Sequence, residues 1–146
     1  MNRLAAAALF VVLALAAESR VDAHCQVPCG IYDDPARIKL LFEHESTIAK
    51  AIDQIGELAD THEPTGHNQL SRWVLTKEQH ATDIQRIMAD YFMTQRIKPD
   101  AEGYTDLLTK AHAVMIAAMK CKQAADPATA KALHESIRAF EEAYGK

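Results

Sequence analysis

Two of the three cysteines of this chain lie four residues apart beside a histidine, in the segment HCQVPCGIY that runs from His24 to Tyr32. Thiolate sulfur and imidazole nitrogen are ligands that several transition metals prefer, so this spacing could hold a metal ion. Cys25 and Cys29 could equally close a small disulfide loop in an exported protein. A structural zinc site would need a second cysteine pair, and a thioredoxin-type or haem attachment site would need Cys-x-x-Cys; the sequence contains neither.

A short apolar leader precedes these cysteines. Residues 4–17 are all apolar, follow a basic start and are too few to span a bilayer as a helix. They predict a signal peptide comprising residues 1–23, in which Ala23 ends a small-x-small pattern; a cut after Ala16 also fits such a pattern. We therefore expect an exported product, periplasmic or extracellular, with no membrane anchor after processing and with His24 as its first residue.

Cleavage after Ala23 would bring several metal donors together at the new chain end. The free α-amino group, the imidazole of His24, the sulfurs of Cys25 and Cys29 and the intervening backbone nitrogen would lie within one turn of chain. Nitrogen and thiolate donors in a nearly planar set suit Ni(II) or Cu(II), and thiolate donation stabilises the higher oxidation state. The segment thus predicts a redox-active metal hook, with the disulfide loop as the alternative.

The composition of the rest of the chain favours one helical domain. Ala, Glu, Lys, Gln and Leu are common and aromatic residues make up only 6% of the chain. The length suits one domain with one hydrophobic core. The net charge of -4, with Lys and Arg scattered along the chain, offers no basic surface, so we expect no nucleic-acid partner.

Apolar side chains recur every three or four residues along four segments, as one face of a helix requires. Asp34 offers a capping carboxylate directly before a proline, which predicts a first helix from there to about residue 60. Its stripe comprises Ile38, Leu41, Phe42, Ile48, Ile52, Ile55 and Ala59. The polar stretch 61–68 (THEPTGHN) contains proline and glycine and predicts a loop. The second stripe starts at residue 70 and must end before Pro99.

The two remaining stripes complete the predicted fold. Residues 104–119 carry the third, and Asp126 before a proline starts the fourth helix, which extends to residue 144. Four amphipathic helices joined by short loops favour an all-α, antiparallel, up-and-down four-helix bundle. The predicted organisation is a signal peptide (1–23), a metal-binding hook (24–33) and a bundle domain (34–146).

The segment HCQVPCGIYDDP resembles the amino-terminal hook of the nickel superoxide dismutase family, whose pattern is His-Cys-x-x-Pro-Cys-Gly-x-Tyr followed closely by Asp and Pro. Three further segments resemble parts of that family: residues 77–79 (KEQ), 90–92 (DYF) and 126–129 (DPAT). The resemblance implies one nickel ion per subunit, cycling between Ni(II) and Ni(III) while two superoxide anions and two protons become dioxygen and hydrogen peroxide. It also implies a homohexamer.

The resemblance implies roles for individual residues, with Tyr32 and Tyr91 as the catalytic side chains beside the metal. His24, Cys25 and Cys29 would bind the nickel, and Tyr32 would stand over its open face. Tyr91 would be a second tyrosine close to the hook, or else an aromatic residue of the bundle core with its hydroxyl at the edge.

A second group of residues would orient the hook imidazole. In the family these are a glutamate on the first helix and an arginine on the second, and here the arginine position holds His80. His80 would either take that role or be an ordinary core histidine. Glu43 and Glu45 both fit the glutamate; Glu45 is slightly favoured because it lies within the apolar stripe, where a carboxylate needs a partner.

In this acidic chain, local cations would have to attract an anionic substrate, and those expected near the metal end are Arg37, Lys39 and Lys77. The other histidines show no ligand spacing and are expected at the surface or in loops: His44, His62, His67, His112 and His134. Two other interpretations remain open. One is an exported metal-binding module that uses the hook without turnover, and the other is a structural helical protein with a Cys25–Cys29 disulfide.

Overall fold

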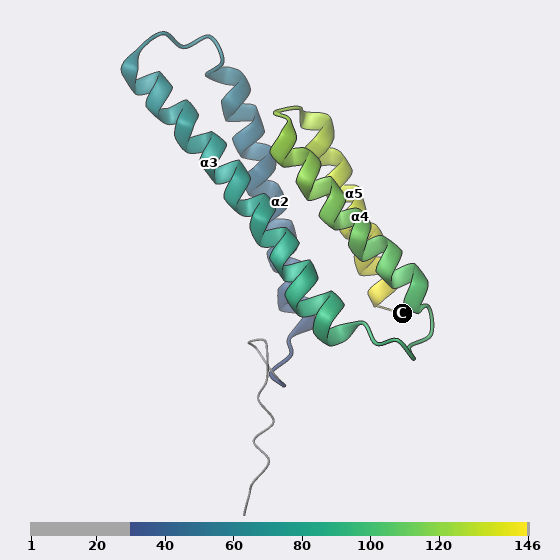
Figure 1. Ribbon diagram of the computed structural model, residues 1–146. Helices are drawn as coiled ribbons and strands as arrows, with labels where there is room; N and C mark the ends of the chain where they lie inside the picture. Colours follow the sequence, from purple (N-terminus) through teal and green to yellow (C-terminus); the bar gives the residue numbers. More distant parts are fainter. Residues whose placement is uncertain (1–29, 146) are drawn as a thin grey trace, which may run out of the picture.

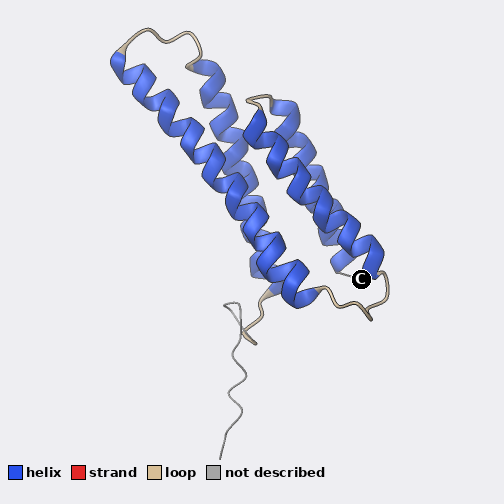
Figure 2. Cartoon of the chain, viewed as in Figure 1, coloured by secondary structure: helices blue, strands red, loops and turns tan. Residues whose placement is uncertain are grey.

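The computed structural model describes residues 30–145; the predicted signal peptide and hook residues 24–29 lie outside the described residues, as does Lys146. Within 30–145 all regular structure is helical (Figure 2). The elements are α2 (Asp34–Glu57), α3 (Pro64–Arg86), the π-helical segment η1 (Ile87–Arg96), α4 (Tyr104–Gln123) and α5 (Pro127–Tyr144).

The helices form two antiparallel hairpins, α2 with α3 and α4 with α5 (Figure 1). Helix α3 also packs on α4, and α2 on α5, so each helix touches two neighbours. This is the arrangement of an up-and-down four-helix bundle, and the predicted fold class is confirmed. Within residues 30–145 no helix has the length and apolar character of a membrane span.

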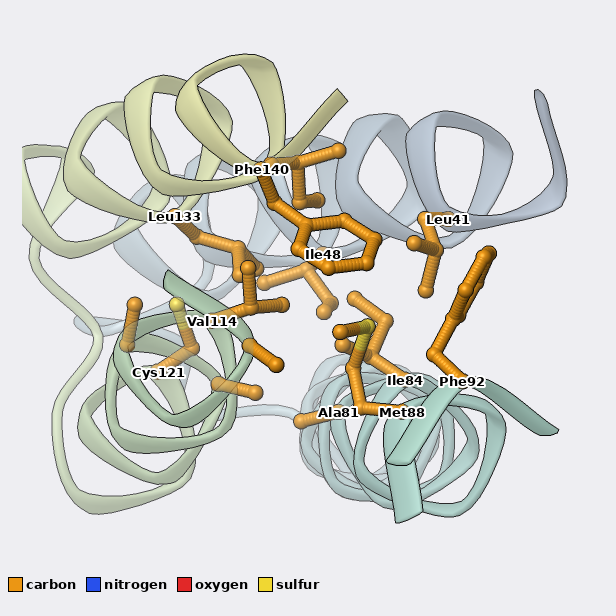
Figure 3. Packing of buried hydrophobic residues seen from close by; sticks show 14 of the residues in the cluster. Leu41, Ile48, Ala81, Ile84, Met88, Phe92, Val114, Cys121, Leu133 and Phe140 are labelled. Atoms are coloured by element: carbon orange, nitrogen blue, oxygen red, sulfur yellow. The ribbon is translucent and has the colours of Figure 1, made fainter. Parts of the chain in front are cut away.

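The core is aliphatic along its length and becomes aromatic towards one end (Figure 3). Leu41 and Ile48 of α2 are fully buried, as the apolar stripe predicts. Burying a side chain of this size contributes about 1.5–3 kcal/mol. The rings of Phe92 and Phe140 meet edge to face, with centroids 5.0 Å apart. This contact joins η1 to α5, which brings their last turns close together.

The start of α2 differs from the prediction by one residue. Asp33, rather than Asp34, is the capping residue, and its carboxylate accepts the N–H of Ala36 at 3.1 Å. Asp34 is therefore the first helical residue, and its carboxylate is free for contacts with other helices. Asp126 caps α5 as predicted, accepting the N–H of Ala128 at 2.9 Å.

The loop predicted over residues 61–68 is wrong in its second half, because α3 begins at Pro64. Proline fits the first turn of a helix, where its missing N–H would have no partner within the helix. Gly66 is buried, and a Cβ added to it would lie only 1.8 Å from Oγ1 of Thr61. The glycine therefore leaves room for the Thr61 side chain against the first turn of α3.

The second helix ends before Pro99 as predicted, but its last part, η1, is a π-helix that no sequence pattern indicated. The N–H of Ile97 donates to the carbonyl of Phe92, five residues back, at 2.8 Å. In an α-helix, residues five apart would point roughly 140° apart. The wider turn instead brings Tyr91 and Arg96, five apart, to the same carboxylate, that of Asp34.

Candidate functional site

The beginning of α2, the end of η1 and the end of α5 meet at the end of the bundle where the described chain starts (Figure 1). Gly30 has a φ of 72°, a left-handed conformation that glycine adopts at little cost. Among residues 30–145 no three His, Cys, Asp or Glu side chains converge as a metal site would require. His24, Cys25 and Cys29 lie outside the described residues, so their role as nickel ligands stays a prediction.

The carboxylate of Asp34 is the centre of a polar cluster at this end of the bundle. It accepts a hydrogen bond from the hydroxyl of Tyr91 at 2.5 Å and one from the hydroxyl of Tyr144 at 2.9 Å. Arg96 donates to both carboxylate oxygens, from Nε at 2.9 Å and from Nη2 at 2.6 Å. One carboxylate thereby ties the start of α2 to the ends of η1 and α5.

The protonation states of this ion pair are fixed by its contacts. Burial raises the pKa of Asp34, but hydrogen bonds from Arg96, Tyr91 and Tyr144 outweigh burial and hold that pKa below its ordinary value. The hydrogen bond to Asp34 raises the pKa of Arg96. Both groups stay charged at neutral pH, and a paired, bidentate geometry of this kind is stronger than a simple surface contact.

Tyr91 is a buried aromatic residue, 4% exposed, with its hydroxyl in this cluster. The hydroxyl donates to Asp34 and accepts the backbone N–H of Asp33 at 3.1 Å. Burial, reinforced by the Asp34 carboxylate, raises the pKa of Tyr91 to about 12. The hydroxyl therefore holds its proton firmly, which suits a supporting contact better than proton donation. Its predicted catalytic role stays a prediction.

Tyr32 lies at the surface beside this cluster and is 40% exposed. Its ring centroid is 4.4 Å from Cζ of Arg96 and 6.0 Å from the ring centroid of Tyr91, with the two rings nearly perpendicular. Arg37 lies over the Tyr91 ring, with Cζ 5.3 Å from the centroid, and its buried Nε has no hydrogen-bond partner among the described residues. Two guanidinium groups and two tyrosine rings thus gather where the predicted hook joins α2.

His80 meets a residue that we expected at the surface or in a loop, His44. The Nδ1 atoms of the two imidazoles are 2.7 Å apart across the contact of α2 with α3. The expectation for His44 is wrong because its side chain is half-buried against α3. Burial, and then the nearby His80, lower the pKa of His44.

The two glutamate candidates lie on different faces of α2, one buried and one exposed. Glu45 is buried, and its carboxylate lies 3.1 Å from Nδ1 of His134 on α5. Glu43 is exposed and pairs with Lys39 at 3.7 Å. Since His24 lies outside the described residues, the choice between them, and the orienting role of His80, stay predictions.

One cation expected near the metal end is placed elsewhere. Lys77 is 4% exposed, and its ammonium group donates to the carbonyls of Cys121 and Lys122 at 2.6 and 2.8 Å, at the end of α4. It closes a helix end and is not available to an anion in solution. Arg96, which does lie at the site, was missed because an α-helical projection turns it away from Tyr91.

Comparison with known proteins finds one matching family and named relatives. A family model described as nickel-containing superoxide dismutase matches residues 19–146. Superoxide dismutase (Ni) of Streptomyces seoulensis is 31% identical over 114 residues, covering 75% of this chain and 76% of the relative. The protein of the same name from Streptomyces coelicolor is 32% identical over 113 residues, with the same coverage. No solved structure matches the chain.

Proposed function

The chain belongs to the nickel-containing superoxide dismutase family, and we propose that it disproportionates superoxide to dioxygen and hydrogen peroxide with bound nickel. The observation that carries this proposal is the family match over residues 19–146, which spans the hook sequence and the bundle. When bound, nickel supplies one-electron chemistry between Ni(II) and Ni(III), so that one superoxide is oxidised and the next is reduced.

We propose that His24, Cys25 and Cys29 hold one nickel ion per subunit. Two thiolates and nitrogen donors fit nickel, and the α-amino group of His24 becomes a donor only after the Ala23–His24 bond is cut. Gly30 supports this arrangement, since its left-handed conformation turns the backbone directly after Cys29.

The described residues would control access to such a metal site and support the residues that surround it. Tyr32, three residues after the last predicted ligand, restricts the approach to the metal with its half-exposed ring. Tyr91 and Asp34 form a wall behind that ring. The wall is rigid because the Tyr91 hydroxyl is hydrogen-bonded to the Asp34 carboxylate. The two protons consumed with each pair of superoxide ions therefore come from solvent or from groups nearer the metal than Tyr91.

Export and assembly are part of the same proposal. The apolar leader supports delivery to the periplasm or the exterior after removal of residues 1–23. Family resemblance supports a homohexamer, and the exposed side chains of Ile31 and Leu75 are apolar groups that a subunit contact would cover.

The deciding experiment compares two forms of the protein that differ by one residue. One form begins at His24, and the other retains Ala23 before it. We expect the first to bind about one nickel per chain and to consume superoxide, while the second loses both properties because its His24 amine is acylated. Equal thermal unfolding of the two nickel-free forms will show that the bundle is unaffected.

The same samples distinguish the alternatives. Nickel bound to the His24 form without superoxide turnover would favour a metal-carrying module. A titration that finds Cys25 and Cys29 oxidised, with no nickel bound, would favour the structural protein with a disulfide. Intact mass of the exported protein reports independently whether the cut falls after Ala23 or after Ala16.

A further inference from the structure

We propose that Arg96 is a positioning residue that holds the ring of Tyr32 in one place and thereby sets the opening to the metal hook. This inference rests on the proposed function, in which Tyr32 covers the nickel. It concerns a residue from the far end of η1, 64 positions after Tyr32 in the chain.

Arg96 uses two sides of its guanidinium group. One edge is bonded to Asp34, through Nε at 2.9 Å and Nη2 at 2.6 Å, and the Tyr32 ring lies 4.4 Å from Cζ. A planar guanidinium group can form a bidentate ion pair and contact an aromatic ring simultaneously, which an ammonium group cannot do. The side chains of Arg96 and Asp34 are only 29% and 22% exposed, so this is not a loose surface pair.

Asp34 is itself held from two other directions. The hydroxyls of Tyr91 and Tyr144 donate to its two oxygens, at 2.5 and 2.9 Å. The carboxylate therefore has little freedom to follow a moving Arg96. The guanidinium group is in turn fixed, and the Tyr32 ring rests against a rigid surface.

The planar shape of the Arg96 guanidinium group matters more for its role here than its positive charge does. The adjoining carboxylate of Asp34 cancels its positive charge, so the pair attracts a superoxide anion only weakly from a distance. The contact with Tyr32, by contrast, depends on the planar group. Positioning and electrostatic attraction thus predict different outcomes when arginine is replaced by lysine.

The test uses Arg96→Lys, which keeps the charge, and Arg96→Gln, which removes it. In nickel-free protein with ¹³C-labelled tyrosine rings, the Tyr32 signal is identified by its loss in Tyr32→Phe. We expect both Arg96 variants to shift this signal towards that of free tyrosine. In nickel-loaded enzyme, we expect hydrogen peroxide to inactivate both variants several-fold faster than the parent, because the opening is wider.

Lys77→Met is the control for general loosening. It removes the buried donor to the carbonyls of Cys121 and Lys122 and shares no hydrogen bond with Asp34 or Arg96, so we expect lower stability with an unchanged Tyr32 signal. If Lys77→Met shifts the signal as much as Arg96→Lys does, general loosening explains the effect and the proposal fails.

Two further results would overturn the inference. One is an Arg96→Lys protein that matches the parent while Arg96→Gln does not, since charge would then be the cause. The other is an unchanged Tyr32 signal in both variants. If the parent binds no nickel or has no turnover, the proposed function fails, while the ring measurement in nickel-free protein still decides the role of Arg96.

Discussion

Nδ1 of His44 lies 2.7 Å from Nδ1 of His80, so two imidazoles on neighbouring helices share a single hydrogen between them. Because one nitrogen must accept, the pair cannot keep this contact when both rings are protonated. Burial and His80 lower the pKa of His44, while Asp83 and Glu43 act in the opposite direction. The hydrogen bond between His44 and His80, which links α2 to α3, is thus favoured at neutral pH.

Acid should weaken the bundle through this pair. A folded-state pKa below the ordinary 6.5 means that the unfolded chain binds the proton more readily, so stability is complete above about pH 6.5 and falls as pH decreases through that range. We expect His44→Phe to lose less stability than the parent between pH 7.5 and pH 5, as measured by urea unfolding.

His112→Gln is the control, since His112 is exposed on α4. We expect it to follow the parent at both pH values. Identical acid sensitivity in His44→Phe and His112→Gln would contradict a special role for the His44 contact.

Alkali should act on a different residue, Tyr91. Its pKa of about 12 in the folded protein lies above the ordinary 10, so its contribution to stability is complete below about pH 10 and is lost as pH rises towards 12. At neutral pH we expect Tyr91→Phe to cost about 1.5–3 kcal/mol, because the lost hydrogen bond has a charged acceptor. The difference between parent and variant should shrink between pH 9.5 and pH 11.5; a constant difference over this range would contradict the role given to the Tyr91 hydroxyl.

Removal of the Lys77 ammonium group should destabilise the end of α4. Lys77→Met would leave the carbonyls of Cys121 and Lys122 without their donor in a buried place, and we expect a loss of roughly 2–3 kcal/mol in urea unfolding. Lys39→Met removes only an exposed ion pair and should cost no more than about 0.5 kcal/mol. Equal effects of the two substitutions would show that burial of Lys77 does not matter.

Gly56 and Gly66 both lie in helices, but only Gly66 is closely packed against another side chain, so replacing each with alanine separates the effect of packing from that of helix propensity. Gly56→Ala meets no atom within 4 Å and should be neutral or stabilise the protein by up to about 0.5–1 kcal/mol. Gly66→Ala should destabilise it by about 1–3 kcal/mol, since the new Cβ would overlap the Thr61 side chain. Adding Thr61→Gly to Gly66→Ala should recover part of this loss in thermal unfolding; no recovery would place the strain elsewhere.

The helices could be predicted because burial selects their residues periodically. Ile38, Leu41 and Ile48 lie at helical spacing, and all three are buried against other helices. The start of α3 was misjudged because proline and glycine have two meanings. Proline ends a helix in its interior but begins one at its first turn, and the sequence around Pro64 fits both roles until the structure shows that α3 begins there.

The candidate site was predictable in part. Tyr32 and Tyr91 stood out through the hook sequence and the DYF segment, and they do lie together at one end of the bundle. Arg96 could not be found from spacing, because its position depends on a π-helix that has no comparable sequence pattern. His44 was overlooked because a histidine between two glutamates looks like a solvent-facing residue until the opposite helix supplies His80.

The bond between Tyr144 and Asp34 joins residues 110 positions apart and sets an order of events during synthesis. Asp34 leaves the ribosome long before Tyr144 is synthesised. Its carboxylate therefore lacks one hydrogen-bond donor until nearly all of the described chain has been made. The rigid wall behind Tyr32 is therefore one of the last parts of the subunit to form. A chain cut short before α5 would therefore lack one of the two tyrosine partners of Asp34, however completely its first helices had formed.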